Sequence, residues 1–513
     1  MMKRKPEEVV NLIVQKVQHL EKNADVQAVG KVVQVGDGVI TVYGLEGVRT
    51  LEIISNAQGA KALVLSLEVS SVGAVILGST DTFSSGDEAC TTGEFLTVPV
   101  GESLLGRVVN ARGEPLDGFG AISATQHAPV EAPAPGILDR KSVDTPLQTG
   151  LKVIDSLVPI GRGQRELIIG DRQLGKTAIA VDTIINQAQM NAHLPDDQKV
   201  YSVYVAVGQK MSKIVNMVQK LRDLNALQYV TIVSASASDP AAYQFLAPYA
   251  GCAMGEYFRD SGQHALVIYD DLSKQAIAYR EISLVLRRPP GREAFPGDIF
   301  YLHARLLERA AQMSDAKGGG SLTALPIVET QEGDLSSYIA TNVISITDGQ
   351  VFLETSLFHE GITPSVNVGY SVSRVGSAAQ SPAIKKLSGT LRLELAQYKE
   401  MASFAKFASD VNVKTRKLLS NGEALVEMFK QAQYEPLDVA EQIVSLYYFA
   451  EHKEEALSPQ KRVLHVQFIR EHLRRNKKLV HALNNHKKYD DALIEKIESI
   501  IVASLKLLGE KSE

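Results

Sequence analysis

Eight consecutive residues match the pattern G-x-x-x-x-G-K-[ST], which is typical of a loop that binds phosphate. They are Gly170, Asp171, Arg172, Gln173, Leu174, Gly175, Lys176 and Thr177. Glycine lets the backbone turn so that successive N–H groups point at phosphate oxygens, and the N-terminus of the following helix adds its dipole. The Lys176 ammonium would reach the β- and γ-phosphates, and the Thr177 hydroxyl would ligate Mg²⁺. The motif therefore predicts a site for ATP or ADP together with Mg²⁺.

An acidic partner for the metal follows an apolar run further along the chain. Residues 265–269 are Ala, Leu, Val, Ile and Tyr, and Asp270 and Asp271 come directly after them. A phosphate loop needs a carboxylate at the end of a neighbouring strand, on the metal side of the site. We predict that Asp270 has this role because it follows the apolar run directly. A carboxylate that only caps the strand end would show the same local pattern, so the prediction depends on the pairing with the loop.

The residue that would activate the attacking water is an amide in this sequence. Hydrolysis of ATP needs a group that orients or deprotonates water, commonly a carboxylate. The apolar run 204–207 ends in Gly208-Gln209-Lys210, where many ATPases with a phosphate loop have Glu. A Gln amide donates and accepts hydrogen bonds but does not accept a proton from water. We therefore predict that the chain binds Mg-nucleotide and hydrolyses it poorly, whereas a surface amide at a strand end is the alternative interpretation of Gln209.

The loop and Asp270 lie in a segment with alternating strand and helix patterns. Strands are predicted at 166–169, 202–207, 230–233, 265–269, 322–328 and 343–346. Helical stretches separate most of them, which indicates an α/β domain with a parallel sheet. We assign residues 97–380 to this domain. The Pro-rich stretch 126–136 is predicted to be a connecting strap.

Different patterns flank the α/β domain on both sides. Residues 1–25 contain an amphipathic helix, and residues 26–96 contain short strands without helices, including a hairpin at Gly36-Asp37-Gly38. Such short strands favour a small barrel or sandwich. Residues 381–513 are predicted to be helical, with one helix that opens at a capping box formed by Asp438 and Glu441. The chain is thus expected to have a β domain, a nucleotide-binding α/β domain and a helical C-terminal domain.

Composition excludes several classes of protein. The 513 residues are 45% hydrophobic and 22% charged, which is typical of packed globular domains and not of disordered or collagen-like chains. A net charge of −5 gives no general attraction to nucleic acid, and two cysteines are too few for a disulfide framework. No apolar run approaches the roughly 18 residues of a membrane-spanning helix, and the N-terminus has no signal-peptide pattern. We expect a soluble, intracellular protein that does not insert into a membrane.

Taken together, these motifs resemble the alpha subunits of F-type (proton-translocating) ATP synthases. The resemblance runs nearly from end to end, and its most specific part is Ser371-Val372-Ser373-Arg374-Val375-Gly376-Ser377. The other matching segments are 35–38, 42–45, 146–150, 161–166, 270–275, 291–298, 364–367 and 431–434.

The resemblance implies a fold, an assembly and further site residues. In that family an N-terminal β-barrel, a RecA-like nucleotide-binding domain and a helical domain form each subunit, and three alpha subunits alternate with three beta subunits around a rotating gamma subunit. Catalysis takes place on beta, alpha holds a noncatalytic, regulatory nucleotide, and ATP is made with energy from a proton gradient. Arg374 corresponds to the arginine finger that reaches the neighbouring beta site, and Gln431 and Gln433 correspond to positions near the adenine.

The resemblance also implies location and partners. Delta and b subunits of a peripheral stalk are expected beside beta and gamma, at the cytoplasmic face of a bacterial plasma membrane, with no nucleic acid. Three positions depart from the family pattern, because Leu174 replaces Thr, Met211 replaces Arg, and Thr363 replaces Arg. These departures are expected to weaken retention of nucleotide on this subunit.

Two other functions use the same phosphate-loop core. A self-sufficient ring ATPase, such as a protein-export motor, would need Glu in place of Gln209 and would not predict the long helical C-terminal domain. A transcription-termination helicase would need an aromatic RNA-binding platform in the β domain and a basic central loop, and neither is evident in the sequence. Turnover of ATP by the purified chain distinguishes these alternatives from a noncatalytic subunit.

Overall fold

The computed structural model describes residues 28–405, 412–451, 458–484 and 489–507. The predicted N-terminal helix lies outside these residues. The chain divides into two compact units, and residues up to Leu96 form one of them together with Glu281–Pro289. Residues Thr97–Arg280 and those from Pro290 onward form the other.

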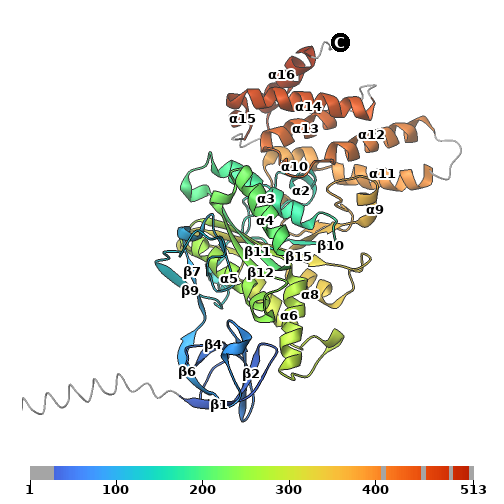
Figure 1. Ribbon diagram of the computed structural model, residues 1–513. Coiled ribbons are helices and arrows are strands. Elements are labelled where there is room, and N and C mark those ends of the chain that lie inside the picture. The colour runs from blue at the N-terminus through green and yellow to red at the C-terminus, as the bar shows by residue number, and fades with distance from the viewer. Residues whose placement is uncertain (1–27, 406–411, 452–457, 485–488, 508–513) are drawn as a thin grey trace, which may run out of the picture. The chain divides into compact units, whose positions relative to one another are not determined.

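The first unit is a closed β-barrel, drawn in blue in Figure 1. Its strands are β1 (Val29–Gly36), β2 (Val39–Gly44), β3 (Glu52–Asn56), β4 (Lys61–Leu67), β5 (Ser71–Ile76) and β6 (Glu88–Phe95), in the order β1-β2-β5-β4-β3-β6. The predicted β1–β2 hairpin is confirmed, because Asp37 and Gly38 have positive φ angles of 49° and 77°. Buried Ile40, Val42 and Ile54 fill the interior. Of the predicted barrel and sandwich, the barrel is correct.

The second unit contains a nine-stranded, mostly parallel sheet with the order β17-β16-β10-β15-β13-β11-β12-β8, and β14 pairs with β15 outside this path. Its strands are β8 (Val108–Val109), β10 (Leu167–Gly170), β11 (Val200–Gln209), β12 (Val230–Ser236), β13 (His264–Asp270), β14 (Ala311–Gln312), β15 (Ser321–Glu329), β16 (Gly349–Leu353) and β17 (Val372–Ser373). β7 (Thr97–Val100) and β9 (Gln126–Pro129) form a separate pair. The strap predicted at 126–136 is therefore wrong over its first four residues, which pair as a strand.

Helices connect and cover the strands (Figure 1). They are α2 (Lys152–Leu157), α3 (Lys176–Asn191), α4 (Met211–Asp223), α5 (Ala241–Asp260), α6 (Leu272–Val285), α7 (Ile299–Leu307), α8 (Tyr338–Ile346) and α9 (Thr355–His359). Short 3₁₀ turns lie at Thr80–Thr82, Glu102–Leu104, Ile137–Asp139, Asp196–Gln198, Leu227–Tyr229, Arg292–Ala294, Asp315–Lys317 and Gly376–Ala379.

The strand predicted at 343–346 is wrong, because these residues end helix α8. Buried Ile339, Ala340, Val343 and Ile346 recur every three or four residues, which is the spacing of one helix face. The β-branched Ile and Val side chains favour strands locally, but the burial of this face determines the structure. The strand of this region is β16, which begins at Gly349.

The C-terminal residues are helical, as predicted. The helices are α10 (Pro382–Ser388), α11 (Leu391–Ala405), α12 (Val413–Phe429), α13 (Val439–Glu451), α14 (Pro459–Arg475), α15 (Lys477–Asn484) and α16 (Asp491–Leu507). Asp438 caps α13 by accepting a hydrogen bond from the backbone N–H of Ala440 at 2.8 Å. Glu441 does not complete the predicted capping box, because its carboxylate pairs with Arg470 and Arg474 of α14.

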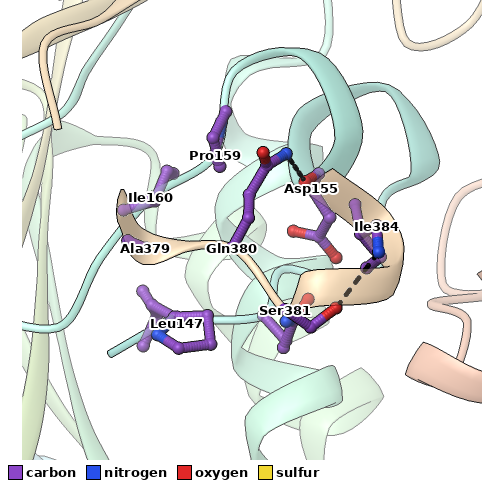
Figure 2. A pocket seen from close by; sticks show the side chains of 10 residues that line it. Leu147, Asp155, Pro159, Ile160, Ala379, Gln380, Ser381 and Ile384 are labelled. Carbon is purple, nitrogen blue, oxygen red and sulfur yellow. Dashed lines mark hydrogen bonds between the residues drawn. The ribbon is translucent and has the colours of Figure 1, made fainter. Parts of the chain in front are cut away.

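The helical domain shares one apolar core with the nucleotide-binding domain, and polar contacts join them at α2. Asp155 of α2 is buried and accepts hydrogen bonds from Thr149, Gly150 and Gln442 of α13. Figure 2 shows the small pocket beside it, where the side chain of Gln380 donates to the Asp155 carbonyl oxygen at 3.0 Å. Among the described residues, the structure contains no helix with the length and apolar character needed to cross a bilayer.

Candidate nucleotide site

The phosphate loop connects strand β10 to helix α3, as its motif requires. Gly170 ends β10, and a Cβ at this position would lie 2.7 Å from the carbonyl oxygen of Leu353 on the adjacent strand β16. Gly175 precedes α3 with a φ of 98°, a left-handed conformation that glycine adopts without strain. Both glycines of the motif are therefore explained by backbone geometry.

Lys176 lies over the loop that precedes it. Its ammonium donates hydrogen bonds to the carbonyl oxygens of Gly170 at 2.7 Å and Asp171 at 2.5 Å, and only 6% of the residue is exposed. Burial lowers the pKa of Lys176, and the negative charges of Glu329, Asp271, Asp270 and Asp171 oppose this shift. The ammonium is thus held beside the loop in a position that suits an anionic ligand.

Asp171 anchors the loop to its surroundings. Its carboxylate accepts hydrogen bonds from the Thr330 hydroxyl at 2.6 Å, the Gly333 N–H at 2.9 Å and the Thr355 hydroxyl at 3.0 Å. Burial opposes ionisation of Asp171, but these hydrogen bonds outweigh it, and its pKa lies below the ordinary value. Asp171 therefore orients the loop, whereas Arg172 and Gln173 are exposed at its tip.

The two predicted metal-side residues are in contact. The Thr177 hydroxyl donates to Oδ2 of Asp270 at 2.7 Å, and the buried Tyr204 hydroxyl donates to the same oxygen at 2.5 Å. Burial raises the pKa of Tyr204, and the adjacent Asp270 charge raises it further, so the phenol remains a donor. A hydroxyl and a carboxylate are oxygen ligands of the kind that Mg²⁺ prefers, usually together with nucleotide phosphates. Thr177 and Asp270 therefore fit a Mg²⁺ ion bound with a nucleotide.

Strand β15 separates the loop strand from the strand of Asp270. β10 pairs with β15 so that Gly170 lies opposite Glu329, and β13 lies on the far side of β15. Asp270 is the last residue of β13, two strands from β10 in the sheet. It contacts the loop region because Thr177 is on the first turn of α3. The sequence predicted a carboxylate at the end of a neighbouring strand, and the structure has one strand, β15, between β10 and the strand of Asp270, while the contact with Thr177 forms.

Sequence reasoning missed Glu329, which ends β15 at the same edge of the sheet. Its carboxylate pairs with Lys274 at 3.2 Å and with the exposed Arg172 at 3.8 Å. Lys274 also pairs with Asp271 at 3.1 Å. Burial raises the pKa of Asp271 to about 6. The signal was present in the sequence, since Glu329 directly follows the apolar run 322–328, as Asp270 follows its own.

Gln209 ends strand β11 beside Asp270. Its side-chain amide donates to the backbone carbonyl oxygen of Asp270 at 2.9 Å. This contact brings Gln209 into the cluster with the metal-side residues and fixes the orientation of the amide. The Gln209 side chain is therefore half-buried and hydrogen-bonded beside Asp270, and its role in a nucleotide site stays a prediction.

Arg374 lies away from the phosphate loop. Its N–H donates to the carbonyl oxygen of Asp348 at 2.8 Å, which holds the backbone at the β16–β17 edge. The guanidinium is exposed and donates to the carbonyl oxygen of Thr347 at 3.2 Å. In the part of the chain that the structure describes, no hydrogen bond or ion pair joins this side chain to the loop. Burial raises the pKa of the nearby Glu166, and the positive charge of Arg374 opposes this rise.

The two C-terminal glutamines have different surroundings. The Gln431 amide donates to the carbonyl oxygens of Gly150 and Glu435, both at 2.8 Å, and accepts from the Lys152 N–H at 3.2 Å. Gln433 is exposed, and its side chain has no hydrogen bond to another described residue. The same loop contacts the phosphate-loop helix, because the Tyr434 N–H donates to Asp182 of α3 at 2.8 Å.

The three departures from the family pattern lie in different environments. Leu174 is buried in the loop, and its carbonyl oxygen accepts a hydrogen bond from the Ser365 hydroxyl at 3.3 Å. Met211 begins α4 and is 47% exposed. The Thr363 carbonyl oxygen accepts a hydrogen bond from the Gln431 N–H at 2.8 Å, so residue 363 contacts the glutamine loop through its backbone.

Comparison with known proteins assigns three segments of the chain to one family. Residues 25–93 match the beta-barrel domain of the ATP synthase alpha/beta family, and residues 150–373 match its nucleotide-binding domain. Residues 380–504 match the C terminal domain of the ATP synthase alpha/beta chain. ATP synthase subunit alpha from Rickettsia bellii (strain OSU 85-389) is 58% identical over 446 residues, which is 87% of this chain and 87% of that protein. The chain therefore belongs to the alpha subunits of F-type ATP synthases, which bind adenine nucleotide and assemble with the other subunits of the ATP synthase.

Proposed function

We propose that this chain is the noncatalytic, nucleotide-binding alpha subunit of the synthase and that it lends Arg374 to the catalytic site of a neighbouring beta subunit. The observation that carries the proposal is the contrast between an ordered phosphate site and the amide of Gln209 in place of a general base. The site has the cation, the hydroxyl and the carboxylate needed to bind Mg-nucleotide, and the amide has no basic group to accept a proton from water.

The other carboxylates of the site are engaged. Glu329 is paired with Lys274 and Arg172, and Asp271 is paired with Lys274. One carboxylate oxygen of Asp270 accepts hydrogen bonds from the hydroxyls of Thr177 and Tyr204. Because each carboxylate has an electrostatic partner or a ligand role, binding without efficient hydrolysis is the expected behaviour.

The chain's own residues divide the work of binding. Lys176 donates to phosphate oxygens, the loop N–H groups surround them, and Thr177 and Asp270 hold Mg²⁺, which neutralises phosphate charge when bound. Gln431 and Gln433 are proposed to line the adenine end, where the contact between Tyr434 and Asp182 supports the placement of their loop. The buried Leu174 and the exposed Thr363 offer fewer polar side-chain contacts than the usual family residues.

Arg374 is proposed to act on the neighbouring subunit. Arg374 is an exposed residue at the β16–β17 edge, and its guanidinium has one hydrogen bond, to the Thr347 carbonyl oxygen, among the described residues. Its charge also opposes the rise that burial causes in the pKa of Glu166. On the neighbouring subunit, its planar guanidinium would stabilise a phosphoryl group that develops charge in the transition state. An arginine finger of this kind contributes roughly 10³–10⁵ in rate in other NTPases.

We further propose which subunits this chain contacts in the complete enzyme and where the enzyme is located. We expect alternation with three beta subunits around gamma, contact with delta and b, and a peripheral position on the cytoplasmic face of a bacterial plasma membrane. There the complex would use a proton gradient to make ATP from ADP and phosphate. The relative named ATP synthase subunit alpha supports this setting.

Two measurements test the function. The purified chain alone should bind ATP and show negligible steady-state hydrolysis, and brisk turnover by the chain alone would contradict the noncatalytic assignment. In a ring reconstituted with beta and gamma, Arg374→Lys should reduce turnover by about 10³-fold with assembly intact, because an ammonium does not reproduce the planar guanidinium. The exposed Arg222→Lys on α4 is the matched control and should leave turnover unchanged.

A further inference from the structure

Lys213 lies on the first turn of helix α4, directly beside the metal-side residues. Its ammonium nitrogen is 3.2 Å from the hydroxyl oxygen of Thr177 and donates a hydrogen bond to it. Lys213 is an exposed residue, and no ion pair joins its side chain to a carboxylate among the described residues. The Thr177 hydroxyl is therefore shared between the Lys213 ammonium and the Asp270 carboxylate.

The other cations of the site have different partners. Lys176 is held by two backbone carbonyl oxygens, Lys274 is paired with Asp271 and Glu329, and Arg172 is paired with Glu329. Lys213 alone among these four side chains has a hydroxyl as its hydrogen-bond partner. Its charge is thus available to an anionic ligand that lies between the loop and Thr177.

We propose that Lys213 supplies positive charge on the metal side of the phosphate loop, so that this site retains ATP or ADP with a weak dependence on Mg²⁺. The inference rests on the proposed nucleotide site and defines how that site is regulated by metal. Phosphate oxygens that lack a metal would accept hydrogen bonds from Lys176 on one side and Lys213 on the other. The nucleotide would then remain bound when free Mg²⁺ is scarce.

Competition between the ammonium and Mg²⁺ gives the proposal its second consequence. Both use the Thr177 oxygen, and both carry positive charge, so they disfavour each other at close range. A nucleotide-bound site without Lys213 should therefore bind Mg²⁺ more tightly. By linkage, the factor by which the metal improves nucleotide affinity equals the factor by which nucleotide improves metal affinity.

The experiment measures ATP binding to the purified full-length chain by isothermal titration calorimetry, once in excess EDTA and once in millimolar Mg²⁺. Lys213→Met should weaken binding in EDTA by about tenfold, the effect of losing one charge-assisted hydrogen bond, and by less than about twofold with Mg²⁺. It should also lower the Mg²⁺ concentration that gives half-maximal improvement of ATP affinity. Arg222→Met removes the same charge from the last turn of α4 and should change neither quantity.

Lys176→Met separates failure of this inference from failure of the proposed site. If Lys176→Met weakens ATP binding by about 100-fold while Lys213→Met has equal effects with and without Mg²⁺, or no effect, the role of Lys213 is refuted and the nucleotide site stands. Complete loss of ATP binding by the unmodified chain in EDTA also refutes it. If Lys176→Met leaves ATP affinity unchanged, the phosphate site is misassigned and the inference fails with it. Because Lys213 is exposed, its replacement is not expected to affect folding.

Discussion

Replacement of Lys176 by Met tests whether the loop of residues 170–177 binds phosphate. Met retains most of the aliphatic length of Lys and removes the ammonium, which donates to the carbonyl oxygens of Gly170 and Asp171. We expect a large loss of ATP affinity with little change in the free energy of unfolding. A purely structural lysine would show the opposite pattern.

The size of the affinity loss follows from the contacts. Each hydrogen bond from a charged donor to a phosphate oxygen contributes about 1.5–3 kcal/mol, and the ammonium has room for two such bonds beside the loop. Part of this gain is offset, because in the nucleotide-free chain the ammonium already donates to carbonyl oxygens at 2.7 and 2.5 Å. A net loss of about 3 kcal/mol corresponds to roughly 100-fold weaker binding of ATP.

The stability of the nucleotide-free chain should respond differently. Burial lowers the pKa of Lys176, which means that folding disfavours its charged form. Met removes this cost while leaving the two carbonyl oxygens beside an open loop, where water replaces the ammonium. We therefore expect the free energy of unfolding to change by less than about 1 kcal/mol.

Calorimetric titration with Mg-ATP and urea denaturation without nucleotide measure the two quantities. An ATP affinity within threefold of the unmodified chain would refute the assignment of the phosphate site. A loss of several kcal/mol in unfolding free energy, with weak binding as its consequence, would refute the argument that Lys176 is a ligand group and not a structural one. Lys199→Met, at a lysine paired with Asp196, is the control and should preserve ATP affinity.

Two further predictions concern neighbouring buried groups. Tyr204→Phe removes a hydrogen-bond donor to Asp270. In a Mg²⁺ titration with ATP present, the variant should bind Mg²⁺ about tenfold more weakly, whereas its affinity for ATP without metal should be unchanged. An equal loss of ATP affinity in EDTA would contradict the role of Tyr204 in orienting a metal ligand. Burial lowers the pKa of Lys152 to about 7 in the folded chain, so the unfolded chain binds more protons between that value and 10.5, and stability should rise with pH over this window. Urea denaturation at pH 7 and pH 9 measures this effect. The free energy of unfolding of Lys152→Met should rise by roughly 2 kcal/mol less over this range than that of the unmodified chain. An identical dependence of the unfolding free energy on pH in both chains would refute the prediction.

The parts of the site that depend on local sequence were predictable. The phosphate loop is continuous in the chain, and the turn between β1 and β2 follows from Asp37 and Gly38. Asp270 was also identified, because an apolar run that ends in a carboxylate marks the carboxyl edge of a buried strand. Each of these features is determined by residues that are close together along the chain.

The order of the strands was not predictable from local patterns. Glu329 and Asp270 both end apolar strands, and only the sheet order places Glu329 opposite Gly170 and Asp270 one strand further away. Tyr204 of β11 donates to Asp270 of the paired strand β13, although the two residues are 66 positions apart along the chain. The partners of each carboxylate therefore depend on pairing between distant strands, for which a single sequence contains no direct signal.

The error at residues 343–346 has a different physical origin. Val343 and Ile346 have strand preferences, but their burial together with Ile339 and Ala340 on one face of α8 outweighs these preferences. The full period was visible only in a window that begins at Tyr338, after Ser337. A segment of four residues is too short to show the spacing that distinguishes a buried helix face from a buried strand.

The contacts around α2 link the nucleotide site to the C-terminal helices. Gly150 donates to Asp155, which also accepts from Gln442 of α13, and Gln431 donates to the Gly150 carbonyl oxygen (Figure 2 shows the pocket beside Asp155). The loop that carries Gln431 also contacts α3 through Tyr434, and α3 begins at Lys176 of the candidate phosphate loop. A displacement of α3 on nucleotide binding would therefore act on the base of α13 through hydrogen bonds to buried groups. Removal of hydrogen-bond donors from a buried carboxyl group such as that of Asp155 is energetically unfavourable. This junction therefore favours movement of α2 and α13 together.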